Sequence, residues 1–313
     1  MLISNIIYKK LCIHRYEEMP YLGYLKYTDF KGLKYEKYEF TSKGQKMVGG
    51  FYYYDNYKKD SLVIFCHGIG GGYSSYMSEI EMLAQAGYKV LAFDYIGCCK
   101  SEGKDIISMT ESLVNLNACL NSLKDKYDEQ NISVMGHSWG GFAASNIIKY
   151  HPSLHAIIDI SGFISIHKML EGFIKGMGRI LIKGIYKYEK KKNPSLYNSS
   201  AIETLQSCKA KVLIIHDELD NMVPYALSIK LLKEKVNNPN IKYIITKGKY
   251  HNPQYTMDAC SYMRNTFMAF NEAIKKKQIK TLEQKKEFFK DVDWFRMTKQ
   301  DLEIYKSILE TLE

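Results

Sequence analysis

Residues Gly136-His137-Ser138-Trp139-Gly140 decide the fold of this chain, because of what lies on either side of them. The apolar run Ile132-Ser133-Val134-Met135 before them has the pattern of a strand, and a helix is expected to begin after them. Glycines flank the serine where a sharp turn brings neighbouring backbone close and leaves no room for side chains. The segment is typical of a nucleophile elbow, which presents the Ser138 hydroxyl at a helix N-terminus. The neighbouring His137 side chain is expected to point away from the site.

An alternation of strands and helices extends outward from this turn along most of the chain. A β-hairpin is expected over 35–54, and short apolar runs predict buried strands at 62–66, 89–93, 131–135, 156–160, 211–215 and 242–246. Helices are expected at about 75–86, 108–126, 139–150 and 256–276. Because strands alternate with helices, the fold class is α/β, with a mostly parallel central sheet and helices on both faces.

The alternation stops between residues 161 and 205. Apolar side chains there share one helical face: Met169, Leu170, Phe173, Ile174, Met177, Ile180 and Leu181. Eight basic residues accompany them: Lys168, Lys175, Arg179, Lys183, Lys187, Lys190, Lys191 and Lys192. We interpret the segment as a helical cap inserted over the active site, with a surface helix packed on the sheet as the alternative.

The chain therefore divides into four expected regions. An N-terminal extension covers 1–34, the core covers 35–160 and 206–276, the cap covers 161–205, and a C-terminal helical extension covers 277–313. In the last region Thr298-x-x-Asp301 resembles a capping box, and Leu302, Tyr305, Leu309 and Leu312 form an apolar stripe. This stripe predicts a docking helix without chemistry.

Composition narrows the class of protein. The 313 residues are 46% hydrophobic, and neither a signal peptide nor an apolar run long enough to cross a membrane is found. Seven cysteines, odd in number and scattered, indicate a reduced, cytoplasmic protein without zinc-ligand spacing. The net charge is +10, but no nucleic-acid recognition motif accompanies it, so no nucleic-acid partner is expected. The basic cap fits a weak contact with an anionic membrane surface.

Four segments, in this order along the chain, resemble those of the α/β-hydrolase family. They are His67-Gly68-Ile69-Gly70-Gly71-Gly72 after a buried strand, the elbow around Ser138, the stretch 216–224 (HDELDNMVP), and Gly248-Lys249-Tyr250-His251 after the last strand. The resemblance covers about residues 35–275. It implies an α/β-hydrolase fold and a serine hydrolase similar to esterases and monoacylglycerol lipases.

The resemblance also implies roles for individual residues. Ser138 would be the nucleophile and His251 the general base, and Asp220 would orient the histidine. Asp217 stands where the family usually has glycine, so it remains a competitor for the role of Asp220. The backbone N–H groups of Ile69 and Trp139 would form the oxyanion hole.

The expected reaction is hydrolysis of a small acyl ester or monoacylglycerol-type substrate through an acyl-enzyme, with no cofactor and no metal. Alternatives on the same fold are a serine aminopeptidase, an acyl-peptide hydrolase and a thioesterase. A binding protein that kept the fold without catalysis is a further alternative. The motifs do not define the acyl chain, because fold does not fix substrate.

Overall fold

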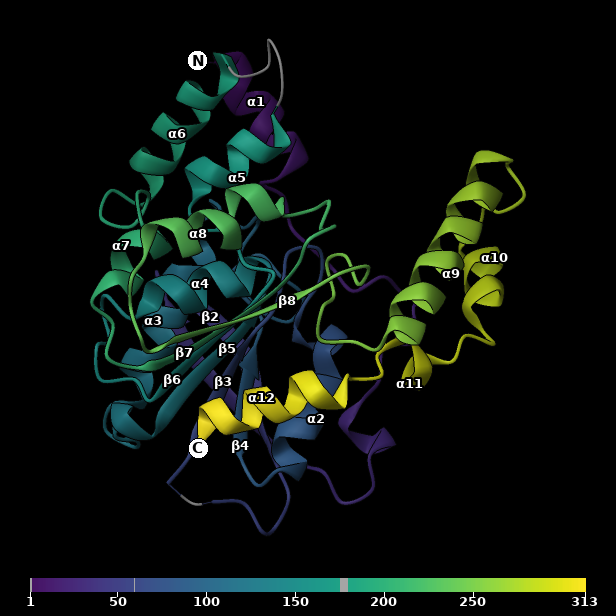
Figure 1. Cartoon of the computed structure of the whole chain (residues 1–313). Helices are drawn as coiled ribbons and strands as arrows, with labels where there is room; N and C mark the ends of the chain where they lie inside the picture. The colour runs from purple at the N-terminus through teal and green to yellow at the C-terminus, as the bar shows by residue number, and fades with distance from the viewer. Residues whose placement is uncertain (1, 59, 175–179) are drawn as a thin grey trace.

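The computed structural model describes residues 2–58, 60–174 and 180–313 (Figure 1). One eight-stranded sheet forms its centre, in the order β1-β2-β4-β3-β5-β6-β7-β8. The strands are β1 (Lys34–Ser42), β2 (Gln45–Tyr53), β3 (Leu62–Cys66), β4 (Lys89–Phe93), β5 (Ile132–His137), β6 (Ala156–Ile160), β7 (Lys211–Asp217) and β8 (Ile241–Thr246). Strand β2 is antiparallel to β1 and β4, whereas all neighbours from β4 to β8 are parallel. The expected mostly parallel sheet is confirmed.

Two hydrophobic clusters cover the two faces of the sheet, because successive side chains of a strand point to opposite sides. In β3, Ile64 belongs to one cluster and Val63 and Phe65 to the other. The first face is covered by α3 (Glu111–Leu123), α4 (Trp139–Ile147), α7 (Ala201–Gln206) and α8 (Ile229–Lys235). The second is covered by α2 (Met77–Gln85) and α12 (Leu302–Leu312). The expectation of helices on both faces is therefore confirmed as well.

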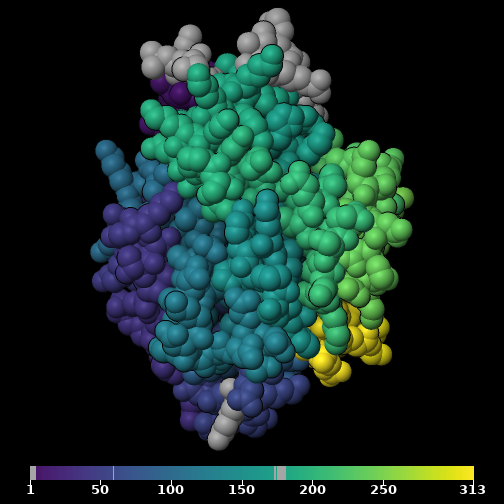
Figure 2. Space-filling view, turned by 90° about the vertical axis from the view of Figure 1, so that its left-hand side faces the viewer, coloured from purple at the N-terminus to yellow at the C-terminus, as the bar shows by residue number. Residues whose placement is uncertain are grey.

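The segment between β6 and β7 forms α5 (Ile166–Phe173) and α6 (Ile180–Lys192) before α7. Residues Lys175, Met177 and Arg179 of the expected basic, apolar helix lie outside the described residues. Helix α6 packs against α5 and against α1 (Leu2–Leu11), the helix of the N-terminal extension. Figure 2 shows α6 in teal beside α1 in dark purple at the top of the molecule. That this group of helices acts as a cap stays a prediction.

The C-terminal region is divided between an arm and the core. The helix expected over 256–276 is α9 (Met257–Lys275), which packs with α10 (Leu282–Phe289) and α11 (Trp294–Met297) as an arm beside the core (Figure 1). Helix α12 docks on the core, as expected from its apolar stripe, and contributes Ile304, Ile308 and Leu312 to it. An apolar stripe identifies the buried face of a helix but not the surface on which that face packs. The expected end of the core at residue 276 therefore leaves out α12, although α12 packs on the sheet.

The start of α12 also differs from the sequence prediction. Its N-cap is Asp301, whose side chain accepts hydrogen bonds from the amides of Glu303 and Ile304. Thr298 ends α11 instead. Both residues can cap a helix, and the short α11 places Thr298 too early to begin α12. No helix within the described ranges is long and apolar enough to span a bilayer.

Candidate active site

The elbow joins β5 to α4, and its serine has a strained backbone. Ser138 has φ 56° and ψ −110°, outside the regions that L-residues usually occupy. Added Cβ atoms at Gly136 and Gly140 would collide with the backbone carbonyls of Gly140 and Cys66 respectively. The two glycines therefore allow the tight crossing that turns Ser138 out of the sheet edge, where it lines a cavity.

His251 and Asp220 meet beyond the carboxyl ends of β8 and β7. His251 Nδ1 lies 2.8 Å from Asp220 Oδ2, and the Asp220 side chain is fully buried. The amides of Met222 and Val223 donate to the other oxygen of Asp220 at 2.8 and 2.9 Å, which aims Oδ2 at the histidine. Because Nδ1 faces a carboxylate it carries the proton, which leaves Nε2 able to accept one.

Electrostatics keep this carboxylate ionised. Burial alone would raise the pKa of Asp220, but hydrogen bonds from His251 and the Val223 amide outweigh it and leave the pKa below its usual value. His216 lies beside the same carboxylate and holds its turn through a 2.9 Å contact from Nε2 to the Val223 carbonyl. Burial lowers the pKa of His216, so this histidine stays neutral and supports the turn.

Asp217, the competitor for the role of Asp220, is engaged elsewhere. Its carboxylate accepts from the Thr246 hydroxyl at 2.8 Å and from the amides of Gly248 and Lys249 at 3.2 and 2.9 Å. These bonds tie the end of β7 to the loop that carries His251. Asp217 therefore supports that loop, and the carboxylate that reaches the His251 ring is Asp220.

Sequence reasoning missed the side chain that connects the elbow to His251. His137 was expected to point away from the site, but its Nε2 lies 2.8 Å from the His251 carbonyl oxygen, and the two imidazole rings are 4.8 Å apart. Its Nδ1 lies 2.9 Å from the Tyr76 hydroxyl, which accepts from the Gly68 amide at 3.0 Å. A histidine beside the nucleophile was the only signal available, since its partners come from distant segments.

The directions of these hydrogen bonds follow from the chemistry of the groups. A carbonyl can only accept, so His137 Nε2 is protonated and Nδ1 accepts from the Tyr76 hydroxyl. Burial lowers the pKa of His137 to about 3, so the ring remains neutral. The hydrogen bonds from Gly68 through Tyr76 and His137 to His251 thus connect three segments. These are the loop 67–72 (the oxyanion loop), the elbow, and the loop 247–256 that carries His251 (the histidine loop).

His137, the neighbour of Ser138, is bonded to the His251 carbonyl, but the described residues show no hydrogen bond between the Ser138 and His251 side chains. Such contacts are commonly long in enzymes without substrate and shorten in the complex. The amides of Ile69 and Trp139 also donate to no other group in the described ranges. Both residues line the same cavity as Ser138.

That cavity has a volume of about 650 Å³ and an almost entirely apolar wall. Part of the wall comes from the elbow, Ile69 and Phe163, and another part from α1, α5 and α6. The lining residues are Ile7, Tyr8, Leu11, Cys12, Tyr16, Ile69, Met109, Ser138, Trp139, Phe163, Met169, Leu170, Ile174, Leu181, Ile185, Met222 and Val223. Buried Glu189 of α6 holds α1 in place by accepting from the Tyr8 hydroxyl at 2.7 Å.

Comparison with known proteins agrees with this geometry. The family model described as serine aminopeptidase, S33, matches residues 57–202, and an esterase from Pyrococcus furiosus superposes with a TM-score of 0.58. That superposition has 23% identity and covers 82% of this chain and 96% of the esterase. The chain therefore has the α/β-hydrolase fold, which is the fold that the resemblance in its sequence implied.

Two curated relatives match shorter stretches of this chain. A 2-hydroxy-6-oxononadienedioate/2-hydroxy-6-oxononatrienedioate hydrolase from Pseudomonas putida is 36% identical over 113 residues, which is 33% of this chain and 39% of the relative. A proline iminopeptidase from Saccharolobus solfataricus is 30% identical over 137 residues, 40% of this chain and 42% of that protein. The chain thus spans less than half the length of either relative.

Proposed function

We propose that this chain is a serine hydrolase of carboxylic esters, with Ser138, His251 and Asp220 as its catalytic residues. The observation that carries the proposal is the hydrogen bond between His251 and Asp220. His137 connects the loop that carries His251 to the strained elbow at Ser138. A strained turn that exposes a hydroxyl beside an oriented imidazole is the arrangement that nucleophilic acyl transfer needs.

In the first half of the reaction, Ser138 Oγ attacks the ester carbonyl carbon while His251 Nε2 removes the hydroxyl proton. Asp220 stabilises the resulting imidazolium. The amides of Ile69 and Trp139 receive the carbonyl oxygen as it becomes an oxyanion. Collapse of this intermediate breaks the ester bond, and His251 returns the proton to the departing alkoxide. The products are the free alcohol and an acyl group on Ser138.

In the second half, water gives a proton to His251 Nε2 and adds to the acyl carbon. A second oxyanion forms at the same amides, and on its collapse His251 returns the proton to Ser138 Oγ as the carboxylic acid leaves. The apolar walls of the cavity exclude bulk water from the oxyanion and so strengthen the hydrogen bonds that stabilise it.

The large cavity supports an ester with an apolar acyl chain. Its wall is built from aliphatic and aromatic side chains of α1, α5 and α6, and Ser138 and Trp139 also line it. Burial of an apolar chain contributes roughly 0.8 kcal/mol for each methylene group. We therefore expect kcat/KM to rise with acyl length until the chain fills the cavity.

Hydrolysis of p-nitrophenyl esters from acetate to palmitate tests the proposal, with Ser138→Ala compared with the unmodified chain. We expect the variant to lose at least about a thousandfold in kcat, because the nucleophile is gone. Ser207→Ala, which changes an exposed serine, is the matched control. Equal rates for the unmodified chain and Ser138→Ala on every ester would contradict the proposal, as would failure of a fluorophosphonate to label Ser138.

Aminopeptidase activity is the second candidate, because the matching family model is described by that activity. Recognition of a substrate ammonium group requires a carboxylate at the site. The cavity lining contains no Asp or Glu among the residues that the structure describes, which favours esters. Hydrolysis of proline p-nitroanilide faster than p-nitrophenyl butyrate would reverse this preference, and acyl thioesters test the thioesterase alternative in the same assay format.

A further inference from the structure

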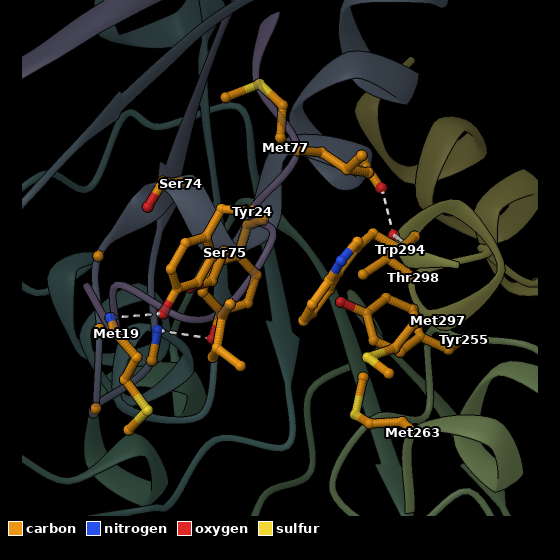
Figure 3. Close-up of a pocket in the computed structure, with 18 of the residues that line it drawn as sticks. Met19, Tyr24, Ser74, Ser75, Met77, Tyr255, Met263, Trp294, Met297 and Thr298 are labelled. Atoms are coloured by element: carbon orange, nitrogen blue, oxygen red, sulfur yellow. Dashed lines mark hydrogen bonds between the residues drawn. The ribbon is translucent and has the colours of Figure 1, made fainter. Parts of the chain in front are cut away.

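A second cavity lies against the oxyanion loop and has a volume of about 260 Å³ (Figure 3). Its walls come from three distant parts of the chain: the loop 68–72, the N-terminal segment with Met19 and Tyr24, and the C-terminal arm with Met263 and Trp294. Ile69 lines both this cavity and the large one that contains Ser138. The residue whose amide is expected to hold the oxyanion is therefore a wall of both cavities.

The lining suits a compact, uncharged, aromatic group. Figure 3 shows aromatic side chains of Tyr24 and Trp294 and the sulfur atoms of Met263 and Met297 around the space. No Asp, Glu, Lys or Arg lines it in the part of the chain that the structure describes. Methionine sulfur and aromatic rings form favourable contacts with an aromatic ligand. An engineered apolar cavity of roughly 150 Å³ binds benzene, so this one accommodates a substituted single ring.

Residues that line the second cavity also contact the two segments that carry His137 and His251. Tyr255 and Met263 follow His251 in the chain, and the Asn252 side chain contacts the Met263 sulfur at 3.7 Å. Tyr76, another lining residue, is bonded to His137. An alkoxide leaving group has to receive its proton from His251, so it departs toward this side. The acyl chain is the other substituent of the carbonyl carbon, and it is then directed to the large cavity.

We propose that the second cavity binds the alcohol portion of the ester and selects esters of single-ring aromatic alcohols. This inference rests on the proposed function, because it assigns one part of the ester to each cavity. Met19, Tyr24 and Trp294 lie outside the stretch that resembles the family, whereas the loop 68–72 and Met263 lie within it. Gly23 permits the N-terminal segment to approach this wall, since a Cβ at this position would collide with the Trp294 indole.

Substitutions that place a larger side chain in the second cavity, from two of its sides, test the proposal. The measured quantity is kcat/KM for the benzyl ester of butyric acid divided by kcat/KM for the methyl ester of the same acid. We expect Met19→Trp and Met263→Trp each to lower this ratio by at least about tenfold, because a bulky side chain occupies the space for the ring. The control is Met268→Trp, on the same helix as Met263 but 62% exposed.

A ratio that stays within about twofold of the unmodified chain in both filling variants overturns the proposal, and so does an equal fall in Met268→Trp. A parallel loss on both esters leaves the ratio unchanged and counts against the proposal in the same way. The ratio therefore separates alcohol binding from general damage to the catalytic residues.

Binding without turnover distinguishes this proposal from the proposed function. The chain has two tryptophans, Trp139 and Trp294, so benzyl alcohol can be titrated into Ser138→Ala while tryptophan emission is recorded. We expect a saturable change that Trp294→Phe removes. Its absence overturns the proposal even if esters are hydrolysed. If no ester is hydrolysed, the proposed function fails, whereas this titration still decides whether the cavity accepts an aromatic alcohol.

Discussion

The hydroxyl of Tyr76 accepts from Gly68 and donates to His137, which in turn donates to the His251 carbonyl. Removing it leaves a backbone N–H and a ring nitrogen without their partner in a buried site. Each such loss costs about 1–3 kcal/mol. Tyr76 touches no reacting atom, so it is a positioning residue whose loss displaces His251 and the oxyanion loop together.

We therefore expect Tyr76→Phe to lower kcat on p-nitrophenyl butyrate by about 10- to 100-fold while KM changes little, because transition-state alignment suffers more than substrate binding. Steady-state kinetics measure this. Tyr243→Phe is the control, since the Tyr243 hydroxyl has no hydrogen-bond partner within the described ranges. A KM effect as large as the kcat effect would refute a positioning role.

Chain order paired His251 with Asp220, and their side chains lie 2.8 Å apart, whereas the catalytic roles of Ser138, Asp220 and His251 stay predictions. His137 was expected to point away, because the orientation of its ring depends on Tyr76 and on the His251 carbonyl, which lie 61 and 114 residues distant. Local pattern contains no information about such partners.

At the scale of elements, α12 is the helix whose place the sequence did not reveal. Its apolar stripe was expected to include Leu302, but that residue is 71% exposed, whereas Ile308 is 1% exposed against the sheet. The pattern predicted a helix with a buried face. It did not show that this face packs on β6 and β7 while α9 joins the arm, because any amphipathic helix satisfies the same pattern.

The position of α12 gives a paired prediction. Ile308→Ala should lower the free energy of unfolding by about 2–5 kcal/mol, because it opens a cavity in the core. Leu302→Ala on the same helix should change it by less than about 0.5 kcal/mol. Urea denaturation followed by circular dichroism measures both. Equal effects of the two substitutions would mean that α12 does not cover the sheet.

The N-terminal end of α12 also supports the loop that carries His251. Lys249 Nζ lies 2.6 Å from Asp301 Oδ2, and the Asp301 amide donates to the Gln254 carbonyl at 2.8 Å. The Thr256 amide donates to the Lys299 carbonyl at 2.9 Å. The C-terminal region, expected to carry no chemistry, thus holds the segments on both sides of residues 252–253 next to His251.

For the whole molecule, buried acids make stability depend on pH. Burial raises the pKa of Asp94 to about 7 and that of Asp159 to about 6. Asp159 accepts from the Ser145 hydroxyl and from the Gly162 amide, and so connects β6 to α4 behind the elbow. Its ordinary pKa in an unfolded chain is about 3.9.

The sign of the Asp159 contribution follows from proton linkage. Below about pH 4 both states are protonated and the contribution is complete. Between about pH 4 and 6 the unfolded chain loses this proton while the folded chain keeps it, so stability falls as pH rises, by about 3 kcal/mol in total. Above about pH 6 both states are ionised and the dependence ends.

Asp159→Asn should remove this slope. The difference in unfolding free energy between the unmodified chain and Asp159→Asn, measured by urea denaturation at intervals from pH 4 to 7, is expected to shift by about 3 kcal/mol in favour of the variant as pH rises. Asp291→Asn, at an exposed position, serves as the control. A difference that is constant over this interval would contradict the assignment.

The packing of α12 on β6 and β7 also determines when this protein can finish folding during synthesis. All eight strands have left the ribosome while α12, which covers β6 and β7 on the second face, is still inside the exit tunnel. Synthesis proceeds at about 5–20 residues per second. The apolar strip of the sheet that Ile304 and Ile308 cover in the folded protein therefore stays exposed for several seconds after β8 emerges. A nascent chain interrupted before residue 302 would retain that strip permanently and become a substrate for chaperones and proteases.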